Sequence, residues 1–138
     1  MSTHYSDIAS ALDARLDAMG ETVAWENIRF VPATDGSLHL RQHNMPASTM
    51  QSDLGASGQD YTTGLYQIDV VGIAGKGKAA IYTLADQVAD QFKRGTSLTY
   101  NGVTVRVIKV ERIGMVIEDK FAFIPVTVEY EAYTAARA

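Results

Sequence analysis

Large apolar residues recur at helical spacing in two segments of the chain. From Ser6 to Met19 and from about Lys78 to Arg94 they repeat at intervals of three and four residues, which predicts two amphipathic helices. A glycine follows each segment, Gly20 and Gly95, and glycine readily takes the left-handed conformation that ends a helix. The repeated residues are Ile8, Leu12, Leu16 and Met19 in the first segment and Ile81, Leu84, Ala85, Val88 and Phe92 in the second.

Alternating apolar and polar residues indicate β-strands in the second half of the chain. Tyr61–Gly72 and Phe121–Tyr133 both alternate, and we expect each to form a half-buried strand. Between Ser97 and Val107 an Asn-Gly pair at 101–102 joins two alternating runs, which predicts a tight hairpin with a type I′ turn. Pro125 cannot donate a ladder hydrogen bond, so we expect the last strand to begin at a sheet edge or a bulge.

The segment after the first predicted helix carries weaker signals. Val23–Pro32 predicts a short extended piece that ends at proline, and a turn then leads into a second extended piece, Ser37–Asn44. Pro46–Gln59 is rich in Ser and Gly, and its only large apolar residues are Met50 and Leu54, which predicts a long mobile loop. Long loops in compact domains are often functional. Met50 and Leu54 are therefore candidate partner contacts.

The order of these elements predicts an α+β fold. A helix is followed by two short strands, a longer strand, a second helix, a hairpin and a final strand. One antiparallel-dominated sheet with two α-helices packed on one face would bury all the apolar stripes together. At 138 residues, with 46% hydrophobic and 20% charged residues, the chain fits one globular domain spanning residues 1–138.

Two of the predicted strands are apolar on both faces. Phe121 and Phe123 lie opposite the main apolar stripe of the last strand, and Leu65 and Val71 lie opposite that of the earlier one. A two-layer monomer would leave this second face in contact with water. Two interpretations remain open: another subunit covers the face, or the first helix or the long loop folds over it.

Charge and composition exclude several classes of function. Twelve Lys and Arg against 16 Asp and Glu give a formal net charge of -4, which provides no general attraction to nucleic acids or anionic membranes. The absence of Cys excludes disulfides, thiolate metal ligands and cysteine nucleophiles. The N-terminus lacks a basic region followed by an apolar stretch, and no apolar run approaches ~18 residues, so we expect neither a signal peptide nor a membrane span.

The segment Gly72–Ala79 resembles a phosphate-binding loop. It follows a predicted strand, precedes a predicted helix and matches the G-x-x-x-x-G-K pattern. A P-loop needs Ser or Thr after this lysine to hold Mg²⁺, and Ala79 has no hydroxyl. A turn that presents Lys76 and Lys78 for partner contacts is therefore favoured over a nucleotide-binding enzyme, which remains the alternative from a different class.

Other combinations that could support catalysis or metal binding are weak. His39 and His43 would lie roughly 13 Å apart in an extended strand, too far to share one zinc ion, and His4 lies near the N-terminus. The carboxylate pairs Glu118-Asp119 and Glu129/Glu131 more simply solvate an outer face or meet Lys or Arg of a neighbouring subunit. No nucleophile motif is present. We therefore predict no catalytic residue, cofactor or metal, and a protein that is not an enzyme.

The chain resembles the tail terminator, or tail completion, proteins of long-tailed bacteriophages. The resemblance covers nearly the whole chain, from the first predicted helix to the last predicted strand, and the shared residues are structural rather than catalytic. They are Val23-Ala24-Trp25-Glu26-Asn27, Phe30, Pro32, Leu40-Arg41, Met45-Pro46-Ala47, Gly64-Leu65-Tyr66-Gln67-Ile68, Gly75-Lys76-Gly77, Leu84-Ala85-Asp86, Phe92 and Gly95-Thr96.

This resemblance implies a structural subunit of the virion tail that is present in the host cytoplasm during assembly. Such subunits close into a ring, expected to be a hexamer, on the end of the tail tube, where they stop polymerisation and provide the surface for head joining. The implied partners are further copies of the chain, the tail tube protein and a head-completion or connector protein. DNA would pass through without specific binding. Another head–tail connector or a minor tail protein is the nearest alternative.

Overall fold

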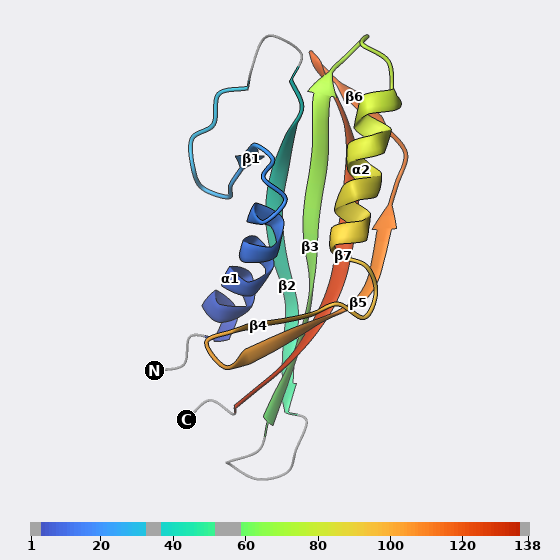
Figure 1. Cartoon of the computed structure of the whole chain (residues 1–138). Coiled ribbons are helices and arrows are strands. Elements are labelled where there is room, and N and C mark those ends of the chain that lie inside the picture. Colours follow the sequence, from blue (N-terminus) through green and yellow to red (C-terminus); the bar gives the residue numbers. More distant parts are fainter. Residues whose placement is uncertain (1–3, 33–36, 52–58, 136–138) are drawn as a thin grey trace.

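The computed structural model describes residues 4–32, 37–51 and 59–135, with two helices and seven strands among them (Figure 1). The side chains of residues 4, 46–51, 59, 60 and 135 lie outside this description. The elements in chain order are α1 (His4–Asp17), β1 (Val23–Ala24), β2 (His39–Gln51), β3 (Gln59–Ile73), α2 (Ala79–Gln91), β4 (Ser97–Tyr100), β5 (Val103–Arg112), β6 (Val116–Glu118) and β7 (Phe121–Ala135).

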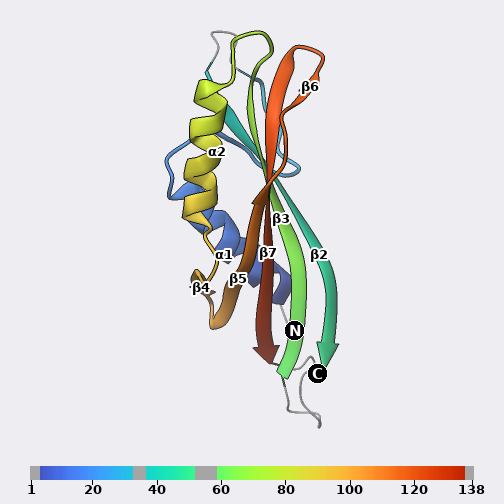
Figure 2. The ribbon, with the colours of Figure 1, turned by 90° about the vertical axis from the view of Figure 1, so that its right-hand side faces the viewer.

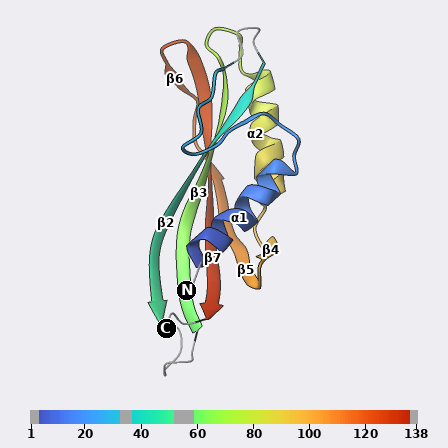
Figure 3. The ribbon, with the colours of Figure 1, turned by 90° about the vertical axis from the view of Figure 1, so that its left-hand side faces the viewer.

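The strands form one curled sheet in the order β1-β2-β3-β7-β5-β4, with β6 paired to β7. Only β1 and β2 run parallel, and every other pair is antiparallel. Both helices pack on the same face of the sheet, as two views from opposite sides show (Figures 2 and 3). The predicted α+β architecture, with its antiparallel-dominated sheet and helices on one face, is therefore confirmed.

The core lies between the helices and alternate residues of the two central strands, β3 and β7. Because successive strand residues point to opposite faces, every second side chain of each strand is buried under the helices. The predicted helical stripes supply the other half of this core. Its largest fully buried side chains are Ile8, Leu12, Leu16, Val88 and Phe92 from the helical segments and Leu40, Tyr66, Ile68, Val70, Ile124 and Tyr130 from the strands.

The predicted helix ends and the hairpin turn depend on residues with positive φ. Gly20 follows α1 with φ +73° and closes it. Gly95, with φ +90°, lies beyond the end of α2, and its N–H bonds to the carbonyl of Val107, so it starts the path into β4 rather than capping the helix itself. Asn101 and Gly102 have φ +51° and +81°, as a type I′ turn requires.

Two predictions for the N-terminal half are wrong in extent. Of the extended piece expected at Val23–Pro32, only Val23–Ala24 is a strand, because the chain turns directly afterwards at Asn27, with φ +58°. The predicted loop at Pro46–Gln59 begins as strand, since β2 continues to Gln51 and stays paired with β3 beyond a register shift between Pro46 and Ser48. Residues 52–58 of that loop lie outside the described residues. Pairing with β3 outweighs the weak local preference of this polar segment.

Pro125 lies in a central strand rather than at a sheet edge. On one side of β7 it faces Asp69 of β3. On the other side the partner of β7 changes from β6 to β5 at this point, and the Pro125 carbonyl accepts a hydrogen bond from the Ile113 N–H. The nitrogen and carbonyl of a strand residue point to the same side. The missing donor therefore faces the irregular connection between β5 and β6, where no regular ladder bond is lost.

Candidate functional site

The face of the sheet that carries no helix is the candidate functional site, and it is called the helix-free face below. It contains the four apolar residues that the sequence places opposite the core. Val71 is only 2% exposed, Leu65 is 36% exposed, and Phe121 and Phe123 are half-buried. The chain therefore covers Val71 by itself, while Leu65 and parts of both phenylalanines remain accessible.

Aromatic side chains cover the end of the helix-free face where β2 begins and β3 ends. The Phe30 ring, from the segment between β1 and β2, lies 4.7 Å from the His39 ring, and the Phe121 ring meets His39 edge-on at 6.4 Å. Burial, with a smaller contribution from the charge of Arg41, lowers the pKa of His39 below its usual value of 6.5. Among the described residues, Phe30 therefore helps to cover this part of the helix-free face. The cover does not come from α1, which lies on the opposite face (Figure 3).

An ion pair holds the middle of the helix-free face. Arg41 donates from Nε and Nη2 to Oδ2 of Asp69, at 2.9 and 2.8 Å, and Gln67 donates to Oδ1 of the same carboxylate at 2.9 Å. The Arg41 guanidinium also lies 4.8 Å from the centre of the Phe123 ring. Arg41 therefore neutralises a buried carboxylate and shields part of an aromatic ring from water.

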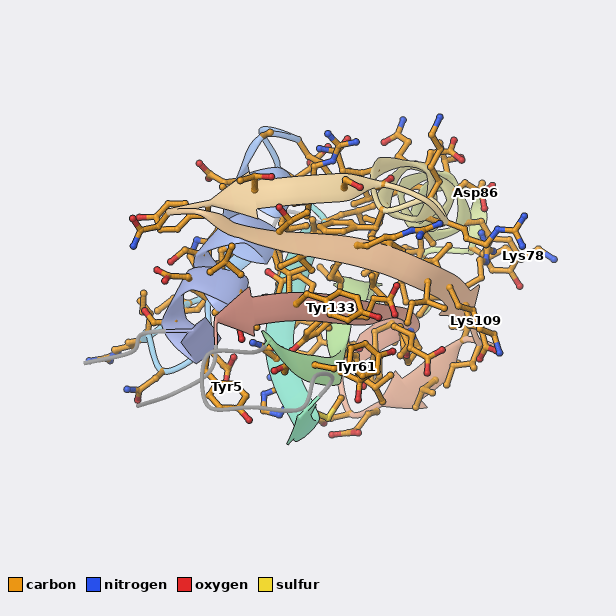
Figure 4. The ribbon with its side chains drawn as sticks, turned by 90° about the horizontal axis from the view of Figure 1, so that it is seen from below. Tyr5, Tyr61, Lys78, Asp86, Lys109 and Tyr133 are labelled. Atoms are coloured by element: carbon orange, nitrogen blue, oxygen red, sulfur yellow. The ribbon has the colours of Figure 1, made fainter. Side chains whose placement is uncertain are left out.

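A second aromatic pair lies at the opposite end of this face, where β3 begins and β7 ends. The rings of Tyr61 and Tyr133 stack at 5.0 Å, and the Tyr61 hydroxyl donates to Glu131 at 2.8 Å. This hydrogen bond raises the pKa of Tyr61 to about 12. Figure 4 shows Tyr61 and Tyr133 side by side when the molecule is seen from below. With Tyr133 half exposed, this end offers another apolar contact area.

The other predicted contact residues are dispersed. Lys76 is exposed in the turn before α2, and Lys78 lies at the N-cap of α2 with its ammonium 5.3 Å from the Tyr82 ring. Met50 lies in β2, paired with Tyr61 along the backbone, so it is not in a loop. Leu54 lies outside the described residues. The structure therefore groups Leu65, Phe121 and Phe123 on one face and leaves the two lysines apart from them.

The loop that resembles a P-loop has a structural explanation. A Cβ at Gly72 would lie 2.8 Å from Cδ2 of Leu38, so close packing accounts for this glycine, and Gly75 and Gly77 have φ of +85° and +84°. The Ala74 N–H is bonded to the carbonyl of Lys120. P-loops rest on parallel sheets, whereas β3, the strand before this loop, has antiparallel neighbours on both sides. These features favour a turn.

The predicted polar pairs are also separated from one another. His39 is buried between aromatic rings, whereas His43 is exposed, with its Nδ1 3.6 Å from Glu26. Glu131 is occupied by Tyr61, and Glu118 is exposed at the end of β6. In the part of the chain that the structure describes, no group of three or more His, Asp or Glu side chains is arranged to hold a metal ion.

The sequence does not reveal a hollow of about 760 Å³ between α1 and the turn after β1. We call it the acidic hollow. Ile28 at its rim is 64% exposed and belongs to the segment predicted to be extended. Three carboxylates converge there because helix spacing places two of them on one side of α1 and the turn supplies the third. The residues that define the hollow are Asp13, Asp17, Trp25, Glu26 and Ile28.

Comparison with known proteins extends this picture. A solved structure with 24% sequence identity superimposes with a TM-score of 0.77, covering 95% of this chain and 96% of that chain. At this identity the match shows a shared fold. No curated protein sequence matches the chain. Neither of the helices that the structure describes is long and apolar enough to cross a lipid bilayer.

The chain is therefore an α+β protein with a fold that a solved structure shares over nearly its full length. The sequence profile of the phage tail terminator proteins matches residues 7–130. The chain belongs to this family, and the resemblance drawn from its sequence motifs is confirmed. Membership identifies it as a structural component of a phage tail and implies interaction with the tail tube.

Proposed function

We propose that the protein forms a ring on the end of the tail tube, stops tube polymerisation and provides the surface for head joining. Membership of the tail terminator family is the observation that carries this proposal. A hexameric ring is the expected form. The helix-free face supports it, because Leu65 and the half-buried Phe121 and Phe123 offer apolar area that a neighbouring subunit or the tube can cover.

The shape of the helix-free face suits a contact with other proteins. The strands β3 and β7 each span 15 residues, so the face is roughly 45 Å long at ~3.3 Å per residue. Its apolar residues are interleaved with the Arg41–Asp69 pair and the carboxylates of Glu129 and Glu131. Protein interfaces commonly combine apolar area with polar and charged groups in this way.

The net charge of the chain supports passage of DNA through the ring without specific binding. The formal charge is -4, so the subunit as a whole repels a phosphate backbone. DNA could then move through the lumen without being held at fixed positions. A head-completion or connector protein would contact the free side of the ring, away from the tube.

Tube assembly in the presence of the purified protein tests the proposal. We expect tubes to stop growing when the protein is added during assembly, and electron microscopy to show a ring at the tube end. Tubes that continue beyond their normal length would overturn the proposal. A connector or minor tail protein, the nearest alternative, would bind finished tails without limiting their length.

A further inference from the structure

The segment that contains α1 and the segment that contains α2 carry opposite charge. Residues 4–32, which form α1, β1 and the following turn, contain five acidic and two basic residues, a formal charge of -3. Residues 75–112, which include α2, β4 and β5, contain seven basic and three acidic residues, a formal charge of +4. Figure 4 shows Lys78 and Lys109 on the side of the molecule away from α1.

The acidic hollow gives the negative side a defined shape. Asp17 is exposed and has no cationic partner among the described residues, whereas Glu26 lies near His43. Arg15, the nearest cation in sequence, points instead to α2, where its Nε donates to the carbonyl of Gln91 at 2.9 Å. The hollow therefore combines an uncompensated carboxylate with the exposed side chain of Ile28.

A cationic cluster lies on the positive side, formed by Lys78, Tyr82 and Arg112. The Lys78 ammonium and the Arg112 guanidinium lie 5.3 and 5.0 Å from the centre of the Tyr82 ring, which is 38% exposed. Arg112 is paired with Asp86, whereas Lys78 meets no carboxylate within the described part of the chain. An aromatic ring between two cations can enter a hollow lined by apolar and acidic side chains.

We infer that a second copy of this chain occupies the acidic hollow, with the cationic cluster of one subunit facing the hollow of the next; this inference rests on the proposed ring. The charges favour this arrangement over a two-fold contact. A two-fold contact through either side would place like charges against each other, whereas a head-to-tail contact brings opposite charges together at every interface. A head-to-tail contact repeated around an axis closes into a ring.

A charge reversal on each side tests the contact. Asp17→Lys is compared with Asp90→Lys, which changes the net charge equally but lies on α2, away from the hollow. We expect Asp17→Lys to raise the dissociation constant of the assembly at least about tenfold, since like charges then face each other. Asp90→Lys should behave as the unmodified protein. Light scattering after size-exclusion chromatography, at low and high salt, measures the assembled mass.

A second set of variants reverses the charge of the cationic cluster. Lys78→Glu should weaken assembly as Asp17→Lys does, whereas Lys93→Glu, beyond the other end of α2, should not. A mixture of the Asp17→Lys and Lys78→Glu proteins should assemble again. The two introduced side chains, one cationic and one anionic, can face each other at one interface, and the two original side chains can face each other at the next. Strict alternation also requires an even number of subunits.

If the ring forms only on the tube, fluorescently labelled subunits are counted on single tube ends instead. The inference is overturned if the unmodified protein stops tube growth but the mixed variants assemble no better than either alone. It is also overturned if Asp90→Lys weakens assembly as much as Asp17→Lys. Failure of the unmodified protein to stop tube growth would instead contradict the proposed function. Normal tube length with a single subunit per tube end would contradict the ring, and the inference with it.

Discussion

The hydroxyl of Tyr66 donates a hydrogen bond to Oδ1 of Asp13 at 2.5 Å and so joins a central strand to α1. Tyr66 is fully buried, and its phenol meets a carboxylate that forms part of the acidic hollow. Burial, followed by the interaction with Asp13, raises the pKa of Tyr66 far above its usual range. The phenol therefore remains a donor, and the contact fixes one wall of the hollow.

Tyr66→Phe should destabilise the protein by about 1–3 kcal/mol, because it removes a hydrogen bond to a charged group and leaves Asp13 partly buried without its donor. Urea unfolding monitored by circular dichroism measures the loss. Tyr100→Phe is the matched control, since Tyr100 is exposed and should change the stability by less than about 0.5 kcal/mol. Equal effects of the two substitutions would show that the hydrogen bond adds no net stability.

The contribution of Asp13 to the stability of the protein should depend on pH. Burial is the largest influence and raises the pKa of Asp13 above its usual value of 3.8, although the hydrogen bond from Tyr66 opposes this. Because the folded pKa is higher than the unfolded one, the contribution of Asp13 is complete below about pH 3.8 and decreases as pH rises through the folded value. The stability of the protein relative to Asp13→Asn should therefore fall as pH rises above about 4. A difference that grows with pH would contradict the direction of this shift.

Arg41→Ala should destabilise the helix-free face. Among the described residues, Gln67 alone would still donate a hydrogen bond to Asp69, whose side chain is 9% exposed. An underpaired buried carboxylate costs about 1–3 kcal/mol. The half-exposed guanidinium places the expected loss toward the lower end of that range. Unfolding in urea measures the effect, and Arg106→Ala, an exposed arginine on β5, should change little. Adding Asp69→Asn to Arg41→Ala should recover part of the loss; no recovery would mean that the burial of charge is not its cause.

Gly102→Ala should cost about 1 kcal/mol, because its φ of +81° is strained for any residue with a Cβ. A Cβ at this position meets nothing within 4 Å, so the cost is conformational rather than steric. Gly114→Ala is the matched control, since Gly114 also faces open space but lacks a positive φ. It should be neutral or slightly stabilising. Thermal unfolding of both variants measures the difference, and equal melting temperatures would argue against the type I′ turn.

Local signals explain why the helices and the hairpin could be predicted from sequence. The apolar stripes that include Leu12 and Val88 have a period that only a helix satisfies, and Asn101-Gly102 sets its own turn. The extension of β2 to Gln51 could not be predicted in this way, because it depends on pairing with β3 rather than on its own polar composition. The three-residue β6 likewise exists through its pairing with β7.

The candidate site could be predicted only in part. Alternation in β3 and β7 places Leu65 and Phe123 on the face away from the core, and the structure agrees. Alternation cannot show what covers each residue, because Phe30 and Arg41 reach this face from elsewhere in the chain. The acidic hollow is missed for the same reason, since it forms only when α1 and a distant turn come together.

The degree of burial on the helix-free face separates residues needed for folding from those available for assembly. Val71 is 2% exposed, so Val71→Asp would place a carboxylate in a dry environment and should unfold the protein. Leu65 is 36% exposed, so the carboxylate of Leu65→Asp can stay hydrated. The effects of Phe121→Asp and Phe123→Asp on stability should lie between those of Val71→Asp and Leu65→Asp, because both rings are half-buried. We expect both proteins to stay folded at reduced stability and to fail in assembly.

Leu65→Asp should therefore keep its circular dichroism spectrum and melt within a few degrees of the unmodified protein, but should no longer limit the length of tail tubes. The reason is that a charge at this position prevents a partner from covering the apolar part of the face around Leu65. Leu65→Met, which keeps the apolar surface, serves as the control and should stop tube growth normally. If Leu65→Asp folds and still stops tube growth, the helix-free face is not the surface through which the protein assembles, which leaves the charged sides of the protein as the contact surfaces.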